Sequence, residues 1–400
     1  AGAAEQQEGE QDAQAPALVK LSEDEANQIK ELIVEKKALK PFAYAKDSDQ
    51  VQIVFNVDRV KITTDWIKTW LELSLAGVAM GFLLFLMASG MTLVFGLMGV
   101  FNLAHGAFIA LGAYIGWKTI TAIDAATVVT EIEMWSPMPG VVPAKAKETL
   151  VELGMFYSSG VASTVFALII GLVVTAVVCG LCGYLFERVI VKPVYSNPLK
   201  QILITMGGSI VIVELLLMFF HSEQAFAKPD FISGQMIFLD FWDGGMGVDK
   251  SRIFAGIVGI AVFIVTVLIL NKTKIGLLIR AGVESREMVE VMGYRINLIF
   301  IMVFIAAIVF AGMGGVIYGL NIEGVGPEMA NDLLIMVIVA IIIGGMGSVK
   351  GCLIGALLIT LANNYMAAIW YPLSGEAGTV SLMVIILMWR PQGLNPITSH

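Results

Sequence analysis

Three polar side chains stand inside long apolar runs of this sequence, where a group that carries charge or forms hydrogen bonds needs a partner. Glu214 is a carboxylate within the apolar stretch 201–220. An ionised acid at the centre of a membrane helix costs about 2.5–3.5 kcal/mol, so a transport function or burial against a partner is favoured over exposure to lipid. A protonated carboxyl group and an ion pair with a second membrane subunit stay open as alternatives. For the pair Asn363 and Asn364, hydrogen bonds between helices are the first interpretation and lining of a pathway is the second.

Polar residues also interrupt the apolar sequence at a first break. Asn102, His105 and Gly106 separate apolar runs near 73–96 and 107–122. Polar side chains at such a break satisfy backbone groups that have lost their helical partners. The competing interpretation is direct contact with a substrate that crosses the membrane.

A second break consists of glycine. Gly344, Gly345 and Gly347 lie where the run 333–349 gives way to the run 351–369. The two breaks occupy corresponding positions in the two halves of the apolar region. Discontinuous helices in matched positions point to a transport site.

The motifs of soluble enzymes and metal sites are missing from the sequence. It contains no G-x-x-x-x-G-K-[ST] loop for ATP phosphates, no H-E-x-x-H and no G-x-S-x-G. Three histidines and three cysteines offer little for a metal site or a disulfide framework. Cys179 and Cys182 lie in an apolar run and are interpreted as small residues at a helix interface. We therefore expect no enzyme activity, no metal and no cofactor, and the lack of a Lys/Arg-rich stripe argues against nucleic acid as a partner.

The composition predicts that lipid surrounds most of the chain. Of 400 residues, 57% are apolar and 14% are charged, and the mean hydropathy is +0.82. A soluble domain carries roughly 25% charged residues. After Glu72, 45 residues pass without a formal charge. At about 1.5 Å per residue this stretch is too long for one crossing of a hydrocarbon core of about 30 Å, so it contains two spans.

The apolar runs predict an all-α polytopic membrane protein with about nine transmembrane helices, some of them broken. They lie near residues 73–96, 107–122, 160–186, 201–220, 253–271, 297–320, 333–349, 351–369 and 377–389. Basic residues gather in the connections 187–200 and 271–297, and acidic residues in 123–159, 221–252 and 321–332. The positive-inside rule makes the basic side cytoplasmic.

Residues 1–70 differ in kind from the transmembrane domain, residues 71–400. They contain 13 acidic and nine basic residues, and we expect a small, partly disordered appendage on the outer side. The first residue is not methionine, which is typical of a chain whose signal peptide has been removed or of a truncated chain. A removed signal peptide agrees with an appendage that faces the periplasm.

The connection 272–296 is the cytoplasmic loop long enough to dock another protein. Its middle, residues 284–292, is expected to form a short charged helix between two glycines. The residues expected to take part are Arg280, Gly282, Glu284, Arg286 and Gly293. An ordinary solvated loop is the alternative.

Four motifs resemble those of the permease family of branched-chain (hydrophobic) amino-acid ABC importers. The first is N-L-A-H-G at 102–106, followed by L-G-A-Y at 111–114. The second lies in 276–293, where glycine, arginine, alanine and glutamate match G-x-x-[IL]-R-A-x-x-E. The third is G-G-M-G-S-x-x-G at 344–351, and the fourth is R-P-Q-G-L at 390–394. Together they extend over most of the transmembrane domain in the family's order.

The resemblance implies a permease subunit of the bacterial inner membrane and a set of partners. These are a second permease subunit, two cytoplasmic ATPase subunits and a periplasmic substrate-binding protein, with 272–296 as the coupling segment. The implied substrates are branched-chain or other hydrophobic amino acids, or a related solute such as urea, an amide or an aromatic acid. The chain departs from the family at Val289 or Glu290, where alanine is usual, and in its long N-terminal segment. An ion-coupled secondary transporter or channel that uses Glu214 is the alternative function.

Overall fold

The computed structural model describes the chain from α2 onward, apart from several connections. The described residues are 66–99, 101–123, 128–130, 148–150, 161–195, 197–220, 223–226, 228, 232–238, 246–284, 286–369 and 374–395. The expected disorder of the N-terminal appendage lies outside the described residues. α2 begins at Trp66. The division of the chain at residues 70 and 71 remains a prediction.

In the described part of the chain, seven helices are long and apolar enough to cross a membrane. They are α2 (Trp66–Met98), α3 (His105–Ile123), α4 (Val161–Phe186), α5 (Pro198–Phe220), α6 (Lys250–Lys272), α9 (Ile296–Ile322) and α11 (Val349–Ile369). Two shorter apolar helices accompany them, α10 (Met329–Gly344) and α12 (Ser374–Trp389). Each of the nine apolar runs coincides with one of these helices, which confirms the all-α polytopic fold.

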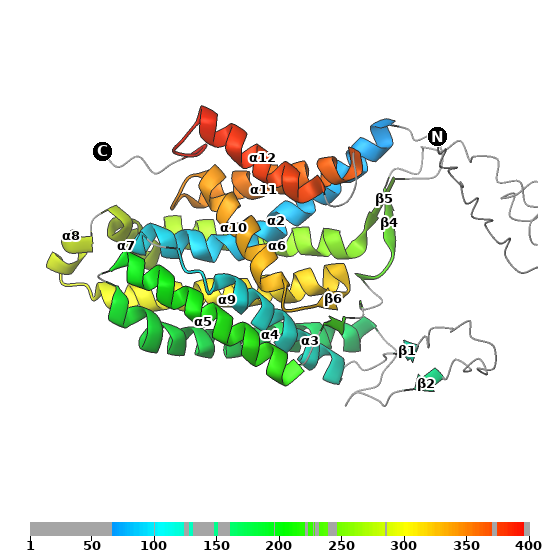
Figure 1. The fold of residues 1–400 in the computed structure, drawn as a ribbon, viewed down its shortest axis with the longest axis horizontal. Coiled ribbons are helices and arrows are strands. Elements are labelled where there is room, and N and C mark those ends of the chain that lie inside the picture. The colour runs from blue at the N-terminus through cyan, green and yellow to red at the C-terminus, as the bar shows by residue number, and fades with distance from the viewer. Residues whose placement is uncertain are drawn as a thin grey trace, which may run out of the picture. The chain divides into compact units, whose positions relative to one another are not determined.

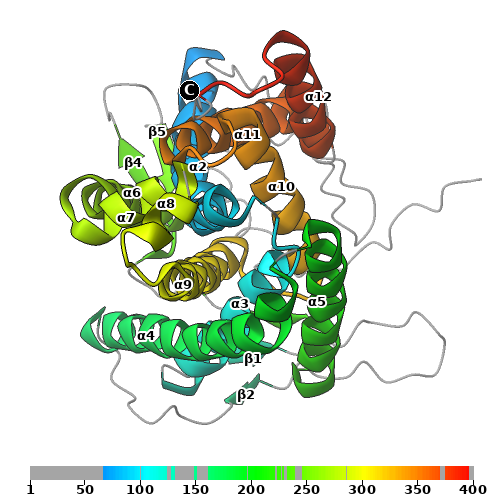
Figure 2. The same cartoon turned by 90° about the vertical axis from the view of Figure 1, so that its left-hand side faces the viewer.

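α9 occupies the middle of the bundle, with α2, α3 and α4 packed against it (Figure 2). Small residues line the contacts. A Cβ added to Gly112 of α3 would lie 2.2 Å from the Cα of Gly312, and one added to Gly90 of α2 would lie 2.4 Å from the Cα of Ala307. Small residues let membrane helices approach until their backbones touch. The position of α3 is therefore fixed by close backbone contact with α9.

Short antiparallel strand pairs from the acidic connections lie at one end of the bundle (Figure 1). The pairs are β1 (Val128–Thr130) with β2 (Glu148–Leu150), β3 (Gln224–Ala225) with β6 (Gly324–Val325), and β4 (Gln235–Phe238) with β5 (Met246–Asp249). β3 and β6 come from two different acidic connections, and Gln224 pairs with Val325. Gly247 of β5 donates its amide to Oε1 of Glu72 at 3.0 Å, which ties this end to the start of α2.

The basic connections share the opposite end. A π-helical turn (Glu187–Val191) and a 3-10 turn (Lys192–Val194) follow α4. Tyr195 then packs edge-on against Phe300 of α9, with 6.0 Å between ring centroids. Phe300 lies just after the connection 272–296, so the two basic connections are neighbours, as the charge pattern predicts. The assignment of this end to the cytoplasm remains a prediction.

The connection between α6 and α9 contains two helices where the sequence analysis expects one. They are α7 (Lys274–Glu284) and α8 (Arg286–Val291). α8 corresponds to the expected helix, and Gly282 precedes it, but Gly282 lies within a second helix, α7. Gly276, Ile279 and Gly282 are buried at a spacing of three residues, so one side of α7 faces the rest of the protein. Gly293, with φ of 85°, follows the end of α8 as expected.

Candidate functional site

The first break lies inside the bundle. Nε2 of His105, the first residue of α3, lies 2.9 Å from the carbonyl oxygen of Met87. Met87 precedes the end of α2 by eleven residues, or about 16 Å along a helix axis. The amide of Leu103 donates to Oγ1 of Thr205 at 3.3 Å, and Thr205 lies about 10 Å inside the start of α5. α3 therefore begins at membrane depth, beside the middle of α2.

The polar groups of this break bond to the chain itself. Oδ1 of Asn102 accepts from the amide of Ala104 at 3.1 Å, and the carbonyl oxygen of Asn102 accepts from the amide of His105 at 3.1 Å. A carbonyl oxygen only accepts, so Nε2 of His105 carries the hydrogen that points to Met87. Both side chains are buried, with 2% and 1% of their surface exposed. This geometry supports the interpretation that Asn102 and His105 satisfy the backbone of a broken helix.

Gly106 allows α3 to begin directly against α10. A Cβ at this position would lie 1.9 Å from the carbonyl oxygen of Ala330 and 2.7 Å from the Cβ of Leu334. No side chain fits into that space. Since Ala330 lies in the first turn of α10 and Gly344 is its last residue, α10 connects the two breaks.

The second break is a close crossing of α10 and α11. A Cβ on Gly344 would lie 2.2 Å from the carbonyl oxygen of Gly351, and one on Gly355 would lie 2.2 Å from that of Ala340. Gly345 has φ of 103°, a conformation that L side chains rarely adopt. The glycines of this motif therefore serve close packing and a sharp reversal of the chain.

The last motif of the chain folds back onto this break. The amides of Leu394 and Asn395 donate to the carbonyl oxygens of Ile343 and Gly344, each at 2.9 Å. The last carbonyl groups of a helix have no partner within it, so this segment closes the end of α10. Gly393 makes the approach possible, because a Cβ there would lie 2.6 Å from the Cα of Gly345.

Asn363 and Asn364 face two different helices. Oδ1 of Asn363 lies 2.9 Å from the place that a Cβ of Gly375 in α12 would take. Nδ2 of Asn364 lies 3.3 Å from the corresponding point at Gly77 in α2, and this atom is buried without a hydrogen-bond partner in the described part of the chain. Both residues therefore lie between helices, and the structure does not bring them to either break.

Glu214 is exposed on the outer side of α5. The interior of this chain does not bury it. It is also separate from the two breaks, since the contact of α5 with the first break is through Thr205.

A buried carboxylate escaped the sequence analysis. Glu187 is 0% exposed, its Oε1 accepts from the hydroxyl of Tyr195, and its Oε2 has no partner among the described residues. It lies in the π-helical turn, a rare conformation that is frequent at functional sites. Glu187 directly precedes Arg188 at the end of an apolar run. This pattern predicts the beginning of a charged, solvent-exposed loop and gives no indication that Glu187 is buried.

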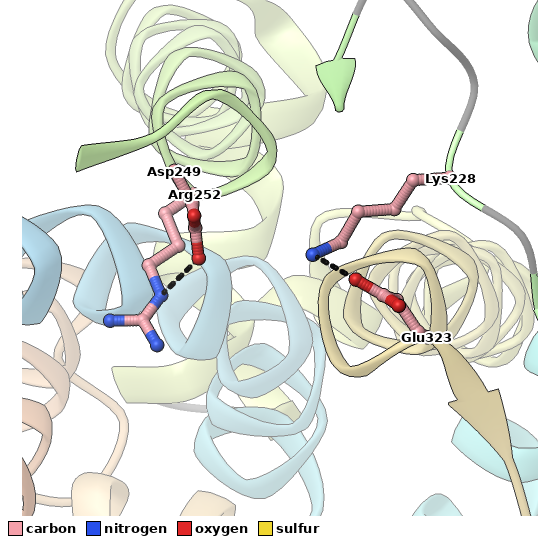
Figure 3. A network of polar contacts seen from close by, with 4 residues as sticks. All are labelled: Lys228, Asp249, Arg252 and Glu323. Atoms are coloured by element: carbon pink, nitrogen blue, oxygen red, sulfur yellow. Dashed lines mark ion pairs between the residues drawn. The ribbon is translucent and has the colours of Figure 1, made fainter. Parts of the chain in front are cut away.

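A cavity of about 560 Å³ lies where β3 and β6 meet the ends of α9 and α10. Its charged lining consists of acids, Glu223, Glu323, Glu328 and Asp332. Nζ of Lys228 pairs with Oε1 of Glu323 at 2.8 Å, and Arg252 pairs with Asp249 at 3.8 Å on a separate element (Figure 3). Sequence analysis placed the acids at this end but not in one cavity, because the pairing of β3 with β6 that brings them together has no local signal.

Comparison with known families explains why the four motifs occur together. A family model described as the permease component of a branched-chain amino acid transport system matches residues 73–389. The chain belongs to this family. The resemblance inferred from the motifs is thereby confirmed, and the match begins within α2 and ends at the last residue of α12.

Two of the individual relatives cover about four fifths of the chain. The chain is 24% identical over 328 residues to the high-affinity branched-chain amino acid transport system permease protein BraD of Pseudomonas aeruginosa. The alignment covers 81% of this chain and 95% of BraD. It is 21% identical over 318 residues to LivH of Escherichia coli K12, which carries the same description, with coverage of 80% and 92%. LivM of the same strain is 28% identical over 163 residues, with coverage of 38% and 37%. No solved structure matches the chain.

Proposed function

We propose that this permease is one of two membrane subunits that form the pathway of an ABC importer for branched-chain amino acids. The family match over residues 73–389 carries the proposal, and the relatives, which are named for branched-chain amino acid transport, support the substrate class. A periplasmic binding protein delivers the amino acid, and two cytoplasmic ATPase subunits supply the energy. The permease itself is then a transport subunit of the inner membrane without enzyme activity.

The surface of α8 supports an ATPase docking site at this end of the bundle. Met288, Val291 and Met292 are 62%, 86% and 65% exposed, although they lie outside the membrane spans. Exposed apolar groups that gather on one element mark contact sites. Arg280 on α7 is exposed as well, and Figure 1 shows α8 at the far end of the bundle from β4 and β5. We assign the energy input to α7, α8 and their junction, which contains Glu284 and Arg286.

The two breaks support a pathway that changes shape near α10. Irregular backbone at membrane depth is maintained only where protein or a water-lined cavity surrounds it. α10 touches the first break at Gly106 and ends in the second at Gly344, so a shift of this short helix would change both. We propose that Asn102, His105 and the glycines of the second break move when α10 shifts, and that this movement changes the shape of the pathway from inside the bundle.

Uptake by the reconstituted importer tests this function. In proteoliposomes that contain the permease, its partner permease and the ATPase subunits, we expect uptake of labelled leucine, isoleucine and valine only with ATP inside and binding protein outside. The permease alone should transport nothing, with or without a proton or sodium gradient. Gradient-driven uptake by the permease alone would instead establish the ion-coupled carrier, and uptake of urea or an amide in place of leucine would reassign the substrate.

The orientation of the permease can be tested separately. We propose that the N-terminal segment is periplasmic and that the connection 272–296 is cytoplasmic, because basic residues gather at the α8 end. Protease added to spheroplasts should cleave within residues 1–65 and leave 272–296 intact. Cleavage of 272–296 in intact spheroplasts would reverse the orientation.

A further inference from the structure

One exposed face of α5 combines apolar residues with a carboxylate. Leu203, Gly207, Ile210, Glu214 and Met218 recur every three or four residues and therefore share one side of the helix. Leu203, Ile210 and Met218 are 72%, 56% and 72% exposed, and Glu214 is exposed among them. Among the described residues, nothing lies within 4 Å of a Cβ built on Gly207. These five residues are called the α5 outer face.

The exposed faces of two other spans have a different composition. The exposed large residues of α4 include Phe166, Ile169, Val173, Val177, Leu181 and Leu185. Those of α6 include Ile257, Ile260, Ile264, Val265 and Leu268. Both faces are apolar through the middle of the helix and suit contact with lipid tails. The α5 outer face differs from them by its acid.

Lipid is an unfavourable neighbour for Glu214 at its depth. The residue lies six positions before the end of α5, or about 9 Å inside it. The ion pairs of the described residues are Lys228 with Glu323 and Arg252 with Asp249, so none of them includes Glu214. Carboxylates within membrane spans face the protein interior, a partner or water. Since this chain leaves Glu214 exposed, its neighbour is water or another molecule.

We propose that the α5 outer face lines the water-filled substrate pathway and that Glu214 binds the ammonium group of the transported amino acid. This inference rests on the proposed importer function. A branched-chain amino acid presents an ammonium group close to an apolar side chain, and the α5 outer face offers the complementary pair. Ile210 lies one turn from Glu214, at the i,i+4 spacing at which side chains are neighbours. Attraction between the carboxylate and the ammonium group is stronger in a narrow pathway than in bulk water, because the effective dielectric constant is lower.

Chemical modification of a cysteine at this position tests the inference. Cys179, Cys182 and Cys352, the three cysteines of the chain, are replaced by alanine, and Glu214→Cys is added in membrane vesicles that contain the complete importer. Glu214→Cys should lower leucine uptake roughly tenfold to a hundredfold, the range for loss of a hydrogen bond to a charged group. A membrane-impermeant methanethiosulfonate with a sulfonate group should react, return a negative charge to the site and restore much of the uptake. The trimethylammonium analogue should react without restoring uptake, and leucine should slow both reactions.

Val177→Cys on α4 provides the control for a lipid-facing position. Val177 is 56% exposed on an apolar face, so its thiol should resist both charged reagents. The complex must transport leucine before Glu214→Cys is added. If the new thiol then resists both reagents, residue 214 lies against lipid or a second subunit, and the inference is overturned. Full uptake by Glu214→Gln would overturn it as well. A third outcome separates the two proposals. If the complex with unsubstituted Glu214 transports no amino acid, the proposed importer function is wrong even when the thiol of Glu214→Cys reacts. The proposed binding of an ammonium group by Glu214 is then wrong as well.

Discussion

In a Gly282→Pro variant, ATP hydrolysis is expected to lose its response to loaded binding protein, and uptake is expected to fall to background. Gly282 is buried in the last turn of α7, within the segment proposed to dock the ATPase. Proline inside a helix removes a backbone donor and clashes with the preceding turn, at a cost of about 3 kcal/mol or more. Coupling requires a contact that differs between two states of the partner. A distorted α7 would present α8 in the wrong direction in both states. Substrate-stimulated ATPase activity in proteoliposomes measures the effect.

The same segment offers a matched control. Lys274 is the first residue of α7, where proline is accepted because the amide needs no helical partner. Thr273 before it is extended, with φ of −107° and ψ of 154°, which suits a residue that precedes proline. Lys274→Pro should therefore retain stimulated hydrolysis. Glu284→Lys, a charge reversal at the end of α7, should weaken binding of the ATPase. Full stimulation in both Gly282→Pro and Glu284→Lys would contradict the coupling role.

The second large effect is expected from a single methyl group at the first break. Gly106→Ala would place a Cβ 1.9 Å from the carbonyl oxygen of Ala330. Overpacking costs about 1–3 kcal/mol where side chains can move aside, and here the obstacle is backbone at the start of α10. We expect little folded permease in the membrane and a clearly lower Tm of the solubilised protein.

Gly180→Ala in α4 is the appropriate comparison. Its Cβ would lie 3.4 Å from Cγ2 of Val309, an ordinary contact. Alanine also favours a helix over glycine by about 1 kcal/mol, so this variant should equal or exceed the unsubstituted protein in Tm. Equal Tm values for Gly106→Ala and Gly180→Ala would show that the start of α3 is not confined by α10.

Hydropathy and glycine content predicted the elements because lipid imposes a strict rule on them. A segment in lipid must satisfy its own backbone, so the apolar run 107–122 forms α3 and the polar residues before it mark a break. The same local signals contain no information on how deep in the helix bundle the break lies. Contacts from His105 to Met87 and from Leu103 to Thr205 join distant parts of the chain. Only these contacts show that the break lies inside the bundle.

Single residues could be interpreted from the sequence where their contacts are local, and could not where their contacts join distant parts of the chain. Asn102 was expected to cap a broken helix, and its bond to the amide of Ala104 spans two residues, which is a local event. Gly282 was expected to border the helix that corresponds to α8, and the additional helix α7 that contains it was not foreseen, because the burial that holds α7 in place is a tertiary effect. Glu187 had no signal at all, since its partner Tyr195 becomes a neighbour only through the π-helical turn.

The return of the chain onto α10 has a consequence for biosynthesis. Ribosomes release the chain from its N-terminus, so α10 enters the membrane before Leu394 and Asn395 have been made. During that interval the carbonyl groups of Ile343 and Gly344 lack the partners that they have in the finished protein, and a polar group without a partner is costly in lipid. The last carbonyl groups of α10 therefore remain without these partners while α11 and α12 are inserted into the membrane. That end of α10 can close only after Leu394 and Asn395 have left the ribosome.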